Sequence, residues 1–589
     1  MTMQKLNIRT INYLTPGLQN AGKSFDGDTK TSWFPGWAPA SYPASLELIF
    51  TSSVNIRKIR VFDGAGIPVL RFIDPHDRVF LETRLDKYQI WREWDVNVDD
   101  ETLVRIELSG IEGDTVVPEI EFWGDPLGGP VTPPPNPVDP ETPVATGAAL
   151  VGTNGFHWVP WGLLAPFSIL RAYQMAEWTW TPAGIAVDPS SRGNVNLDTW
   201  LAEAQKRGIT VAPCINKAPG WFHSLPDGQM TDPDDRGNAH RADAYQQWSS
   251  YLFQIAARYG RKTWPDAALS VNTMPRWEND PVNVRKSGLG LLQYIEPENE
   301  TNRWWRPANE QYTPEQAAAM LSAAYDGHCG SLGALCGIKT ADPTMQVVMP
   351  GLADINVPYL DAMLRWCQQN RADGRFPADV LNVHHYCNTG NHPGDPRVNM
   401  TGTGCHPEAD DLRGRLSDLV RWRDKNLPGL PVWLSEVGYD THQNSVQRAV
   451  PHGGRSAESV QGLWLARTYL EAAAAGVDRC FLFNAIDEPG AANGGLFTSC
   501  GIARGENAGF VKKESWSMIA ALAAALTGRR FAADLSPSPE VRLYAFSGEG
   551  GPLLVAWLPV ADGSTKTVWI DDDSHLISEE PKFLKIKFN

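Results

Sequence analysis

The segment Leu292-Gln-Tyr-Ile-Glu-Pro-Glu-Asn-Glu300 passes from a short apolar run into a polar stretch that ends in a carboxylate. A second segment, Val432-Trp-Leu-Ser-Glu-Val-Gly438, places Glu436 at the same kind of boundary. Short apolar runs that end in turn residues are typical of buried strands. Because parallel strands bring their carboxyl ends to one edge, the two segments predict acids that meet although they are far apart in the sequence.

Both segments belong to a regular alternation of strand-like runs and amphipathic helices across residues 147–531. The apolar runs start at Ala149, Ile169, Ile209, Leu292, Met345, Val380, Val432 and Cys480. Between them, apolar residues recur three and four positions apart from Tyr245 to Tyr259, and Thr313-Pro-Glu-Gln has the pattern of a helix capping box. Eight such units predict a central (β/α)8 TIM barrel.

The sequence changes character on both sides of this region. Residues 126–146 are rich in proline, which predicts an extended linker between domains. Residues 1–125 alternate polar and apolar side chains without a helical period, and short β-rich runs return over residues 532–589. We therefore predict a multidomain protein, with an N-terminal all-β sandwich and a small C-terminal β domain flanking the barrel.

Composition limits the partners of the chain. Its 589 residues exceed what one hydrophobic core usually supports, and no apolar run approaches the roughly 18 residues of a membrane helix. A formal charge of −16 argues against nucleic acid, since binding phosphates needs a basic surface. The 23 tryptophans supply large flat apolar faces of the kind that suit sugar rings.

The cysteines and the N-terminus bear on localisation. Disulfides are possible but not required; the plausible pairs are Cys329 with Cys336 and Cys387 with Cys405, which bracket glycine-rich loops and, if bonded, would indicate an oxidising compartment. The first residues lack an apolar targeting core, so we expect either that a signal peptide was removed or that export uses another route. We predict an extracellular, periplasmic or surface-associated protein.

Glu300 and Glu436 together have the chemistry needed to break a glycosidic bond. One carboxyl group protonates the departing sugar oxygen while the other, about 5 Å away, attacks or shields the anomeric carbon. Glu296 and Glu298 share a strand face with Glu300, but a barrel interior can hold such residues in ion pairs, and we expect both to be structural.

The segment Glu296-Pro-Glu-Asn-Glu300 resembles the strand-four signature of clan A glycoside hydrolases, and Trp433-Leu-Ser-Glu436 resembles their strand-seven nucleophile segment. The resemblance covers roughly residues 147–530. It implies a retaining double displacement on β-glycosidic bonds, with Glu300 as general acid and base and Glu436 as nucleophile. It also implies that Asn299 binds the sugar 2-hydroxyl.

Two further segments are similar to this clan. His384-His-Tyr386 is similar to a His-x-Tyr motif of the clan, and the period of a strand puts His384 and Tyr386 on one side. The resemblance implies that Tyr386 donates a hydrogen bond to the nucleophile. His385 then faces away as a packing residue. Arg171 lies where the clan often holds an arginine that favours the ionised nucleophile.

The chain also departs from the clan pattern. Thr301 stands where a proline commonly follows the acid/base glutamate, and Phe483-Asn484 replaces the usual tryptophan on strand eight. These departures leave the subfamily and the substrate open. Aromatic side chains near predicted strand ends are candidate sugar platforms, which favours an oligosaccharide or polysaccharide. They are Trp158, Trp161, Trp178, Trp180, Trp221, Trp304 and Trp305, of which Trp178, Trp221 and Trp304 are the preferred candidates.

The N-terminal region carries Phe25-Asp-Gly-Asp-Thr-Lys-Thr-Ser-Trp33 and Glu119-Ile-Glu-Phe-Trp123, and it resembles a discoidin-like (coagulation factor type C) sandwich. The resemblance implies a glycan-binding module with one structural calcium. The matching oxygen donors are Asp26, Asp28, Thr31 and Glu119. The alternative is an Asx turn, in which Asp26 and Asp28 bond only to backbone amides.

Two other functions compete with a retaining glycosidase. A non-catalytic adhesin or virion component would keep the barrel only to hold glycans, but a pure binder has no use for two close carboxylates that repel each other. An inverting or non-glycosidic barrel hydrolase would need a wider carboxylate gap or a metal cluster. The sequence shows no His and Asp spacing typical of metal ligands, and we expect no cofactor for catalysis.

Overall fold

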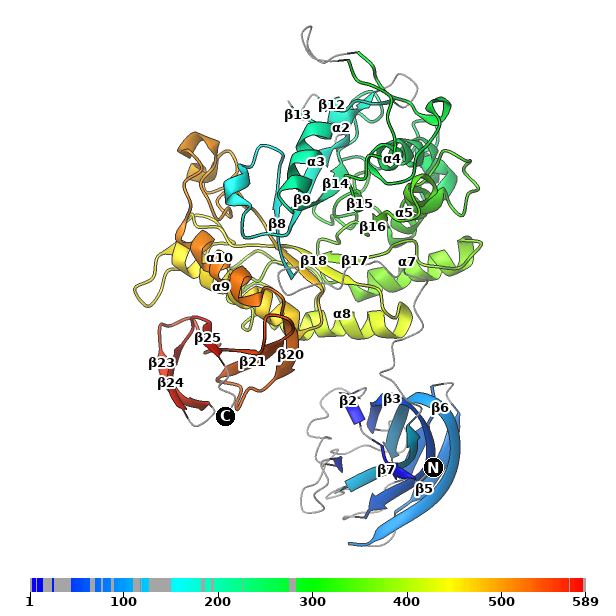
Figure 1. Ribbon diagram of the computed structural model, residues 1–589, viewed down its shortest axis with the longest axis vertical. Coiled ribbons are helices and arrows are strands. Elements are labelled where there is room, and N and C mark those ends of the chain that lie inside the picture. Colours follow the sequence, from blue (N-terminus) through cyan, green and yellow to red (C-terminus); the bar gives the residue numbers. More distant parts are fainter. Residues whose placement is uncertain are drawn as a thin grey trace. The chain divides into compact units, whose positions relative to one another are not determined.

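The chain forms two compact units, Met1–Asn136 and Pro137–Asn589 (Figure 1). The boundary between them falls within the proline-rich segment. The computed structural model describes residues 3–6, 8–13, 24–25, 44–63, 69–75, 78–85, 89–109, 117, 119–126, 150–181, 186–191, 195–225, 227–274, 282–392, 394–570 and 573–585.

The first unit is built on one antiparallel sheet of seven strands. The sheet order is β1 (Gln4–Lys5), β7 (Glu119–Pro126), β3 (Ala44–Phe62), β6 (Trp91–Ser109), β4 (Val69–Ile73) and β5 (Val79–Arg84), and β2 (Ile8–Tyr13) also pairs with β3. Alternate residues of β3 and β6, such as Leu46, Leu48 and Ile106, are buried in a shared apolar core. This period of two agrees with the predicted all-β character. The discoidin-like identity stays a prediction.

Little of the predicted calcium site can be placed. Asp26, Asp28 and Thr31 lie outside the described residues. Glu119 is buried at the start of β7, where its Oε1 lies 3.4 Å from the Nζ of Lys5. Calcium binding therefore remains a prediction from the sequence.

The second unit contains a TIM-like parallel sheet of eight strands. In sheet order these are β16 (Gln346–Val347), β15 (Tyr294–Pro297), β14 (Thr210–Asn216), β9 (Ile169–Met175), β8 (Val151–Gly155), β19 (Arg479–Leu482), β18 (Val432–Val437) and β17 (Leu381–His384). Each strand overlaps one of the eight predicted runs. Backbone bonds from Met349 N to Val380 O (2.9 Å) and from His384 N to Leu352 O (2.7 Å) bring the two edges of this curled sheet together.

Helices surround this sheet (Figure 1). They are α2 (Ala176–Thr179), α3 (Leu197–Lys206), α4 (Gln246–Tyr259), α5 (Pro314–Asp326), α6 (Ile338–Ala341), α7 (Val357–Asn370), α8 (Leu412–Asn426), α9 (Ala457–Ala474) and α10 (Glu514–Leu526). Their ends follow from local sequence: Thr313 and Gln316 form a capping box at the start of α5, and Gly327 ends it in the left-handed conformation.

Short hairpins add β10 (Trp180–Thr181) with β11 (Ala186–Val187), and β12 (Ser190–Ser191) with β13 (Val195–Asn196). The 3-10 helices are η2 (Trp161–Leu163), η3 (Arg236–Asn238), η4 (Ala242–Tyr245), η5 (Asp266–Ala268), η6 (Ala491–Asn493) and η7 (Glu506–Ala508).

The C-terminal strands belong to the same compact unit as the parallel sheet. They form a four-stranded sheet of β20 (Arg530–Asp534), β21 (Arg542–Ser547), β22 (Leu553–Trp557) and β25 (Lys582–Lys585), with a separate hairpin of β23 (Thr565–Ile570) and β24 (Asp573–Ser578). Tyr544 and Trp557 join the apolar core of the parallel sheet and its helices. Tyr544 also donates its hydroxyl hydrogen to Glu471 of α9 at 2.9 Å.

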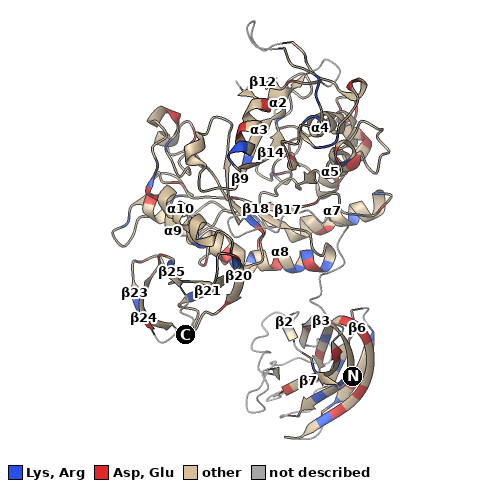
Figure 2. Ribbon diagram, viewed as in Figure 1, with Lys and Arg blue, Asp and Glu red and all other residues tan. Residues whose placement is uncertain are grey.

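Charged residues are dispersed over the molecule. Figure 2 shows acidic and basic residues interspersed along β6 and along α8. Among the described residues, no helix is long and apolar enough to cross a bilayer.

Neither of the two cysteine pairs that the sequence made plausible is a disulfide in the structure. All eight cysteines carry free thiols. Cys336 is buried and its sulfur lies 3.2 Å from the hydroxyl of Ser250 and 3.3 Å from the carbonyl of Leu332, while Cys329 is exposed. A glycine-containing loop between two cysteines therefore did not indicate pairing, because loop composition says nothing of where the sulfurs point.

We expect the buried ion pair between Arg467 and Glu408 to stabilise the contact with the C-terminal sheet. Both side chains are buried, and Arg467 also donates to the carbonyl of Val560 at 2.7 Å. Arg467→Met should lower the free energy of unfolding by about 3–5 kcal/mol, because an unpaired carboxylate stays buried. Arg413→Met, at a half-buried pair with Asp534, should cost about 1 kcal/mol or less. Urea unfolding at pH 7 measures both.

The same ion pair should make stability depend on pH. Burial alone would raise the pKa of Glu408, but Arg467 and His406 hold this pKa well below its ordinary value. The stabilisation is therefore complete above about pH 4.3 and is lost as the pH falls toward the lowered pKa. The difference between the wild type and Arg467→Met should be smaller at about pH 3 than at pH 7; an unchanged difference would contradict this assignment.

Candidate active site

The two glutamates singled out in the sequence lie together at the carboxyl end of the parallel strands. Glu436 is buried within β18, and Glu300 is half-buried in the turn that follows β15. A carboxylate oxygen of each, together with a ring nitrogen of His384, lies within 4.8 Å of the others. His384 and Glu436 are neighbours in register on the adjacent strands β17 and β18.

Glu436 is surrounded by hydrogen-bond donors. Its Oε1 accepts from Arg171 Nη1 at 2.7 Å and from the hydroxyl of Tyr173, and its Oε2 accepts from the hydroxyl of Tyr386 at 2.8 Å. Burial by itself would raise the pKa of Glu436. The charges of His384 and Arg171 and the two tyrosine hydroxyls outweigh burial and lower this pKa, so the carboxylate form is favoured.

Arg171 on β9 connects the two halves of the site. Its side chain is fully buried and forms a bidentate pair with Glu296 on β15, with N–O distances of 2.6 and 2.9 Å. Glu296 also accepts from Gly351 N at 2.9 Å and from the side-chain amide of Asn382 at 3.1 Å. Glu296 is therefore the buried carboxylate that offsets the charge of Arg171. The remaining guanidinium nitrogen, Nη1, donates to Glu436.

Asn299 is oriented by the same guanidinium. Its side-chain oxygen accepts from Arg171 Nη2 at 2.7 Å, which leaves its side-chain NH2 group as the part available to a ligand. Its backbone N–H donates to Glu298 at 2.9 Å. Glu298 pairs with Arg303 at 3.3 Å, and burial raises its pKa. Glu298 and Glu296 thus both have structural partners.

Glu300 is held less tightly than Glu436. Its backbone N–H donates to the carbonyl of Gly351 at 2.9 Å, and its Oε1 lies 2.9 Å from His384 Nδ1. His384 Nε2 is buried and has no hydrogen-bond partner in the described part of the chain. The imidazole lies against Gly351, where a Cβ would overlap the ring. Glycine is therefore needed at this close approach.

The loop after β16 supports the turn that carries Glu300. Asn302 accepts from Ala353 N at 2.8 Å and donates to Asp354 at 2.6 Å. Burial, with a further contribution from the negative charge of Glu300, raises the pKa of Asp354 to about 7.

The predicted tryptophan platforms fall into two groups. Trp221 and Trp304 are each about two-fifths exposed, at 41% and 39%, and Trp178 is half-buried. Trp180, in contrast, is 2% exposed and stacks on Tyr251 with ring centres 4.8 Å apart, so it is a core residue. Strand-end position alone does not distinguish these two roles.

Several residues of the site were not found from the sequence. Tyr173 lies two positions after Arg171 on β9, and this spacing of two was the available signal. Phe497, whose ring centre is 4.3 Å from that of Tyr386, lies in an irregular segment without any such period. Gly351 is recognisable only from the approach of His384.

This arrangement is suited to proton transfer and to stabilising a positive charge. Glu300, His384 and Glu436 are close enough to share a metal ion. However, Arg171 and two tyrosine hydroxyls already bind the oxygens of Glu436, so a cation is in contact with that carboxylate. Glu436, whose carboxylate form is favoured, thus faces Glu300, which is held by fewer contacts.

Comparison with known proteins places the fold. No protein-family model and no curated protein sequence matches the chain. A family 39 glycoside hydrolase from the gut symbiont Bacteroides cellulosilyticus WH2 has a similar structure, with 15% identity and a TM-score of 0.51 over 90% of this chain and 98% of that one. A glucosidase from Croceicoccus marinus aligns over 75% of this chain and 82% of that one (14% identity, TM-score 0.44). A family 30 endoxylanase from Clostridium papyrosolvens C71 aligns over 72% and 84% (13%, 0.39). At these identities the likeness concerns the fold alone.

We predict that Gly351→Ala disturbs this site. The added methyl group must displace the imidazole of His384, which is held by Glu300, and overpacking of this kind costs about 1–3 kcal/mol. Gly162→Ala is the matched control, because its Cβ would meet nothing within 4 Å and should change stability by about 0.5 kcal/mol or less. Urea unfolding of both variants tests this, and equal stabilities would contradict the close packing.

Proposed function

We propose that the chain is a retaining glycoside hydrolase that acts on β-linked oligosaccharides or polysaccharides. The observation that carries the proposal is the approach of Glu300 and Glu436, of which one carboxylate oxygen each lies within 4.8 Å of the other. Carboxyl groups about 5–5.5 Å apart are typical of retaining glycosidases, whereas inverting enzymes leave roughly 6.5–9.5 Å for a water molecule. The fold likeness to a family 39 glycoside hydrolase agrees with this reading.

In the first step, Glu436 attacks the anomeric carbon. Its ionised state is favoured by Arg171 and by the hydroxyls of Tyr173 and Tyr386. As the new bond forms, the negative charge on Glu436 is lost, and Glu300 gives its proton to the departing sugar oxygen. The products of this step are a glycosyl ester on Glu436 and a released alcohol.

In the second step, Glu300 removes a proton from water as the water attacks the same carbon. The glycosyl ester breaks, and Glu436 leaves as a carboxylate in the environment that favours it. Asn299 is placed to bond the sugar through its NH2 group, since Arg171 fixes its oxygen. His384 Nδ1 lies 2.9 Å from Glu300 and 3.5 Å from Glu436, so the imidazole lies between the two acids.

A neutral carbohydrate is the substrate class that the exposed aromatic rings and the net charge favour. The exposed rings of Trp158, Trp221, Trp304 and Trp305 offer apolar faces of the kind that stack on pyranose rings. The net charge of the chain is negative, which disfavours a strongly anionic polymer. We further propose that the first unit binds glycans, as its resemblance implies, and that the protein acts outside the cytoplasm.

The proposal is tested by Glu300→Gln and Glu436→Gln, with Glu315→Gln on the exposed first turn of α5 as the matched control. Loss of general acid catalysis should lower kcat by about 10²–10⁴-fold for Glu300→Gln, and loss of the nucleophile should lower it at least as much. Hydrolysis is measured over a panel of plant, algal and bacterial polysaccharides and aryl glycosides.

Azide separates the two roles. It should restore turnover of an activated aryl glycoside by Glu436→Ala, with inverted configuration at the anomeric carbon observed by NMR. Rescue of Glu300→Ala with inverted configuration and of Glu436→Ala with retained configuration would reverse the assignment. Glycan binding by the wild type without any hydrolysis would instead support the adhesin alternative.

We expect Tyr386→Phe to change the pH dependence of kcat/KM. Tyr386 donates to ionised Glu436 and so helps to lower its pKa. Without this bond the pKa rises, and the acidic limb of the profile should move to higher pH by about 1 unit, the equivalent of one hydrogen bond to a charged group. A Thr468→Val control, away from the two acids, should leave the limb in place. If the acidic limb of the kcat/KM profile lies at the same pH in wild type and Tyr386→Phe, the ionisation of Glu436 does not determine that limb.

A further inference from the structure

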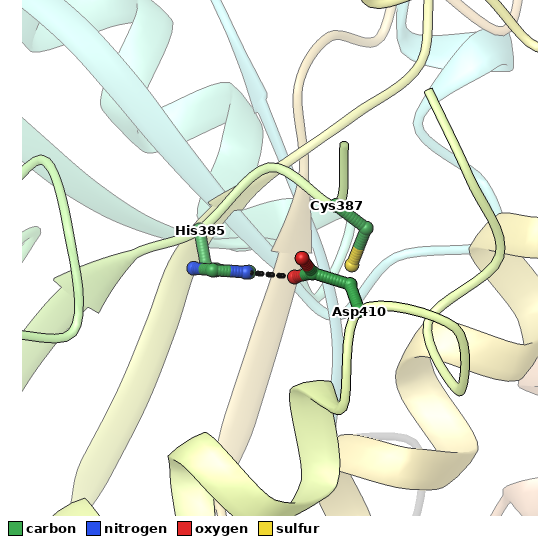
Figure 3. Close-up of side chains that lie close together, drawn as sticks. All are labelled: His385, Cys387 and Asp410. Atoms are coloured by element: carbon green, nitrogen blue, oxygen red, sulfur yellow. Dashed lines mark hydrogen bonds and ion pairs between the residues drawn. The ribbon is translucent and has the colours of Figure 1, made fainter. Parts of the chain in front are cut away.

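A second cluster of reactive side chains lies behind the strand that carries His384 and Tyr386. Figure 3 shows a ring nitrogen of His385 and the sulfur of Cys387 pointing toward the carboxylate of Asp410. The three residues are buried, and their donor atoms lie within 4.8 Å of one another. His385 Nε2 contacts Asp410 Oδ2 directly.

This cluster is separate from the proposed active site. Alternate residues along an extended segment face opposite sides, and His384 and Tyr386 contact the two glutamates while His385 and Cys387 face away. Asp410 comes from a different part of the chain, just before α8. His385 Nδ1 is buried without a hydrogen-bond partner in the described part of the chain, so contacts on the Nε2 side orient the ring.

A second cysteine lies beside this cluster. Cys405 is buried, and its backbone N–H donates to the carbonyl of Cys387 at 3.3 Å. The two chain segments are also joined by an antiparallel bridge between Asn388 and Gly404. Burial, followed by the negative charge of Asp410, raises the pKa of both thiols.

Another cluster of cysteine and aspartate side chains, around Cys329, differs from the one at Asp410 because an arginine occupies it. Asp326, Cys329 and Asp373 also gather within 4.8 Å, but Arg371 donates to both aspartates at 2.8–3.1 Å and Cys329 is exposed. A guanidinium thus already serves as the cation of that cluster. The carboxylate of Asp410 has no such close guanidinium among the described residues. Arg415 Nε lies 4.0 Å from Asp410 Oδ2 and donates at 3.0 Å to the backbone carbonyl of Asp410 instead.

We propose that His385, Cys387 and Asp410 bind a zinc ion. Sulfur, imidazole nitrogen and carboxylate oxygen are the donors that bind zinc in proteins, whereas calcium and magnesium take oxygen ligands. On binding, the thiol of Cys387 loses its proton to solvent and becomes a thiolate ligand of the ion, so that one proton is released for each zinc ion bound.

Such an ion would fix the segment between Cys387 and Asp410 to the end of β17. Tyr386 immediately precedes Cys387 and donates to Glu436. Zinc would therefore act as a structural support for the position of Tyr386, while taking no part in proton transfer. This inference does not depend on the proposed hydrolysis, because its readout is bound metal.

The test uses the full-length chain, expressed in zinc-supplemented medium and passed through gel filtration. Elemental analysis should find roughly one zinc ion per chain. Cys387→Ser and Asp410→Asn should each weaken zinc binding more than roughly tenfold, measured by competition with a chelator of known affinity. Cobalt substituted for zinc should give the visible absorption of a thiolate-bound tetrahedral ion in wild type and lose it in Cys387→Ser.

Cys329→Ser is the matched control and should keep the full zinc content, because the cluster at Cys329 already holds a guanidinium. If Cys387→Ser does not fold, the zinc content of wild type and the affinity of Asp410→Asn decide the question. Wild type without zinc, variants with unchanged affinity, or a disulfide between Cys387 and Cys405 found by peptide mapping of the non-reduced chain would each overturn the proposal.

Discussion

The active-site region depends on one buried guanidinium. Arg171 has no exposure to solvent and contacts Glu296, Asn299 and Glu436, which lie on or after β15 and β18. Removing such a charge from water is expensive unless every donor is satisfied, and a planar fork with five N–H groups can satisfy several acceptors at once. The registers of β9, β15 and β18 are thereby linked, because a shift of any of them would leave a charge unpaired.

The two acids differ in environment, and this difference is the physical basis for giving them different roles. Glu436 is buried among a guanidinium and two hydroxyls, all of which favour its charged form. Glu300 is half-buried, with one contact to His384 and a backbone bond to Gly351. A group that must gain and lose a proton in each cycle is better served by the second environment, and a nucleophile by the first.

The sequence predicted the elements whose signal is local. Each parallel strand coincides with an apolar run, and the acids at strand ends followed from the rule that carboxyl ends converge. Tyr173 was missed because a tyrosine in an apolar strand has the same local pattern whether its hydroxyl meets solvent, backbone or an acid. Gly351 and the free thiols could not be found this way, since both depend on distances between segments far apart in the chain. The same holds for Trp180, which only packing against Tyr251 identifies as core.

The strand end at residues 384–387 serves two sides of the sheet at once. His384 and Tyr386 face the acids, and His385 and Cys387 face Asp410. A slip of one residue would exchange these sets and place a thiol at Glu436. The register between β17 and β18 shifts at Val383 and His384, so the ladder alone does not fix this alternation. Contacts on both faces are needed to hold it, which is why the cluster around Asp410 bears on the geometry of Tyr386 although it lies outside the active site.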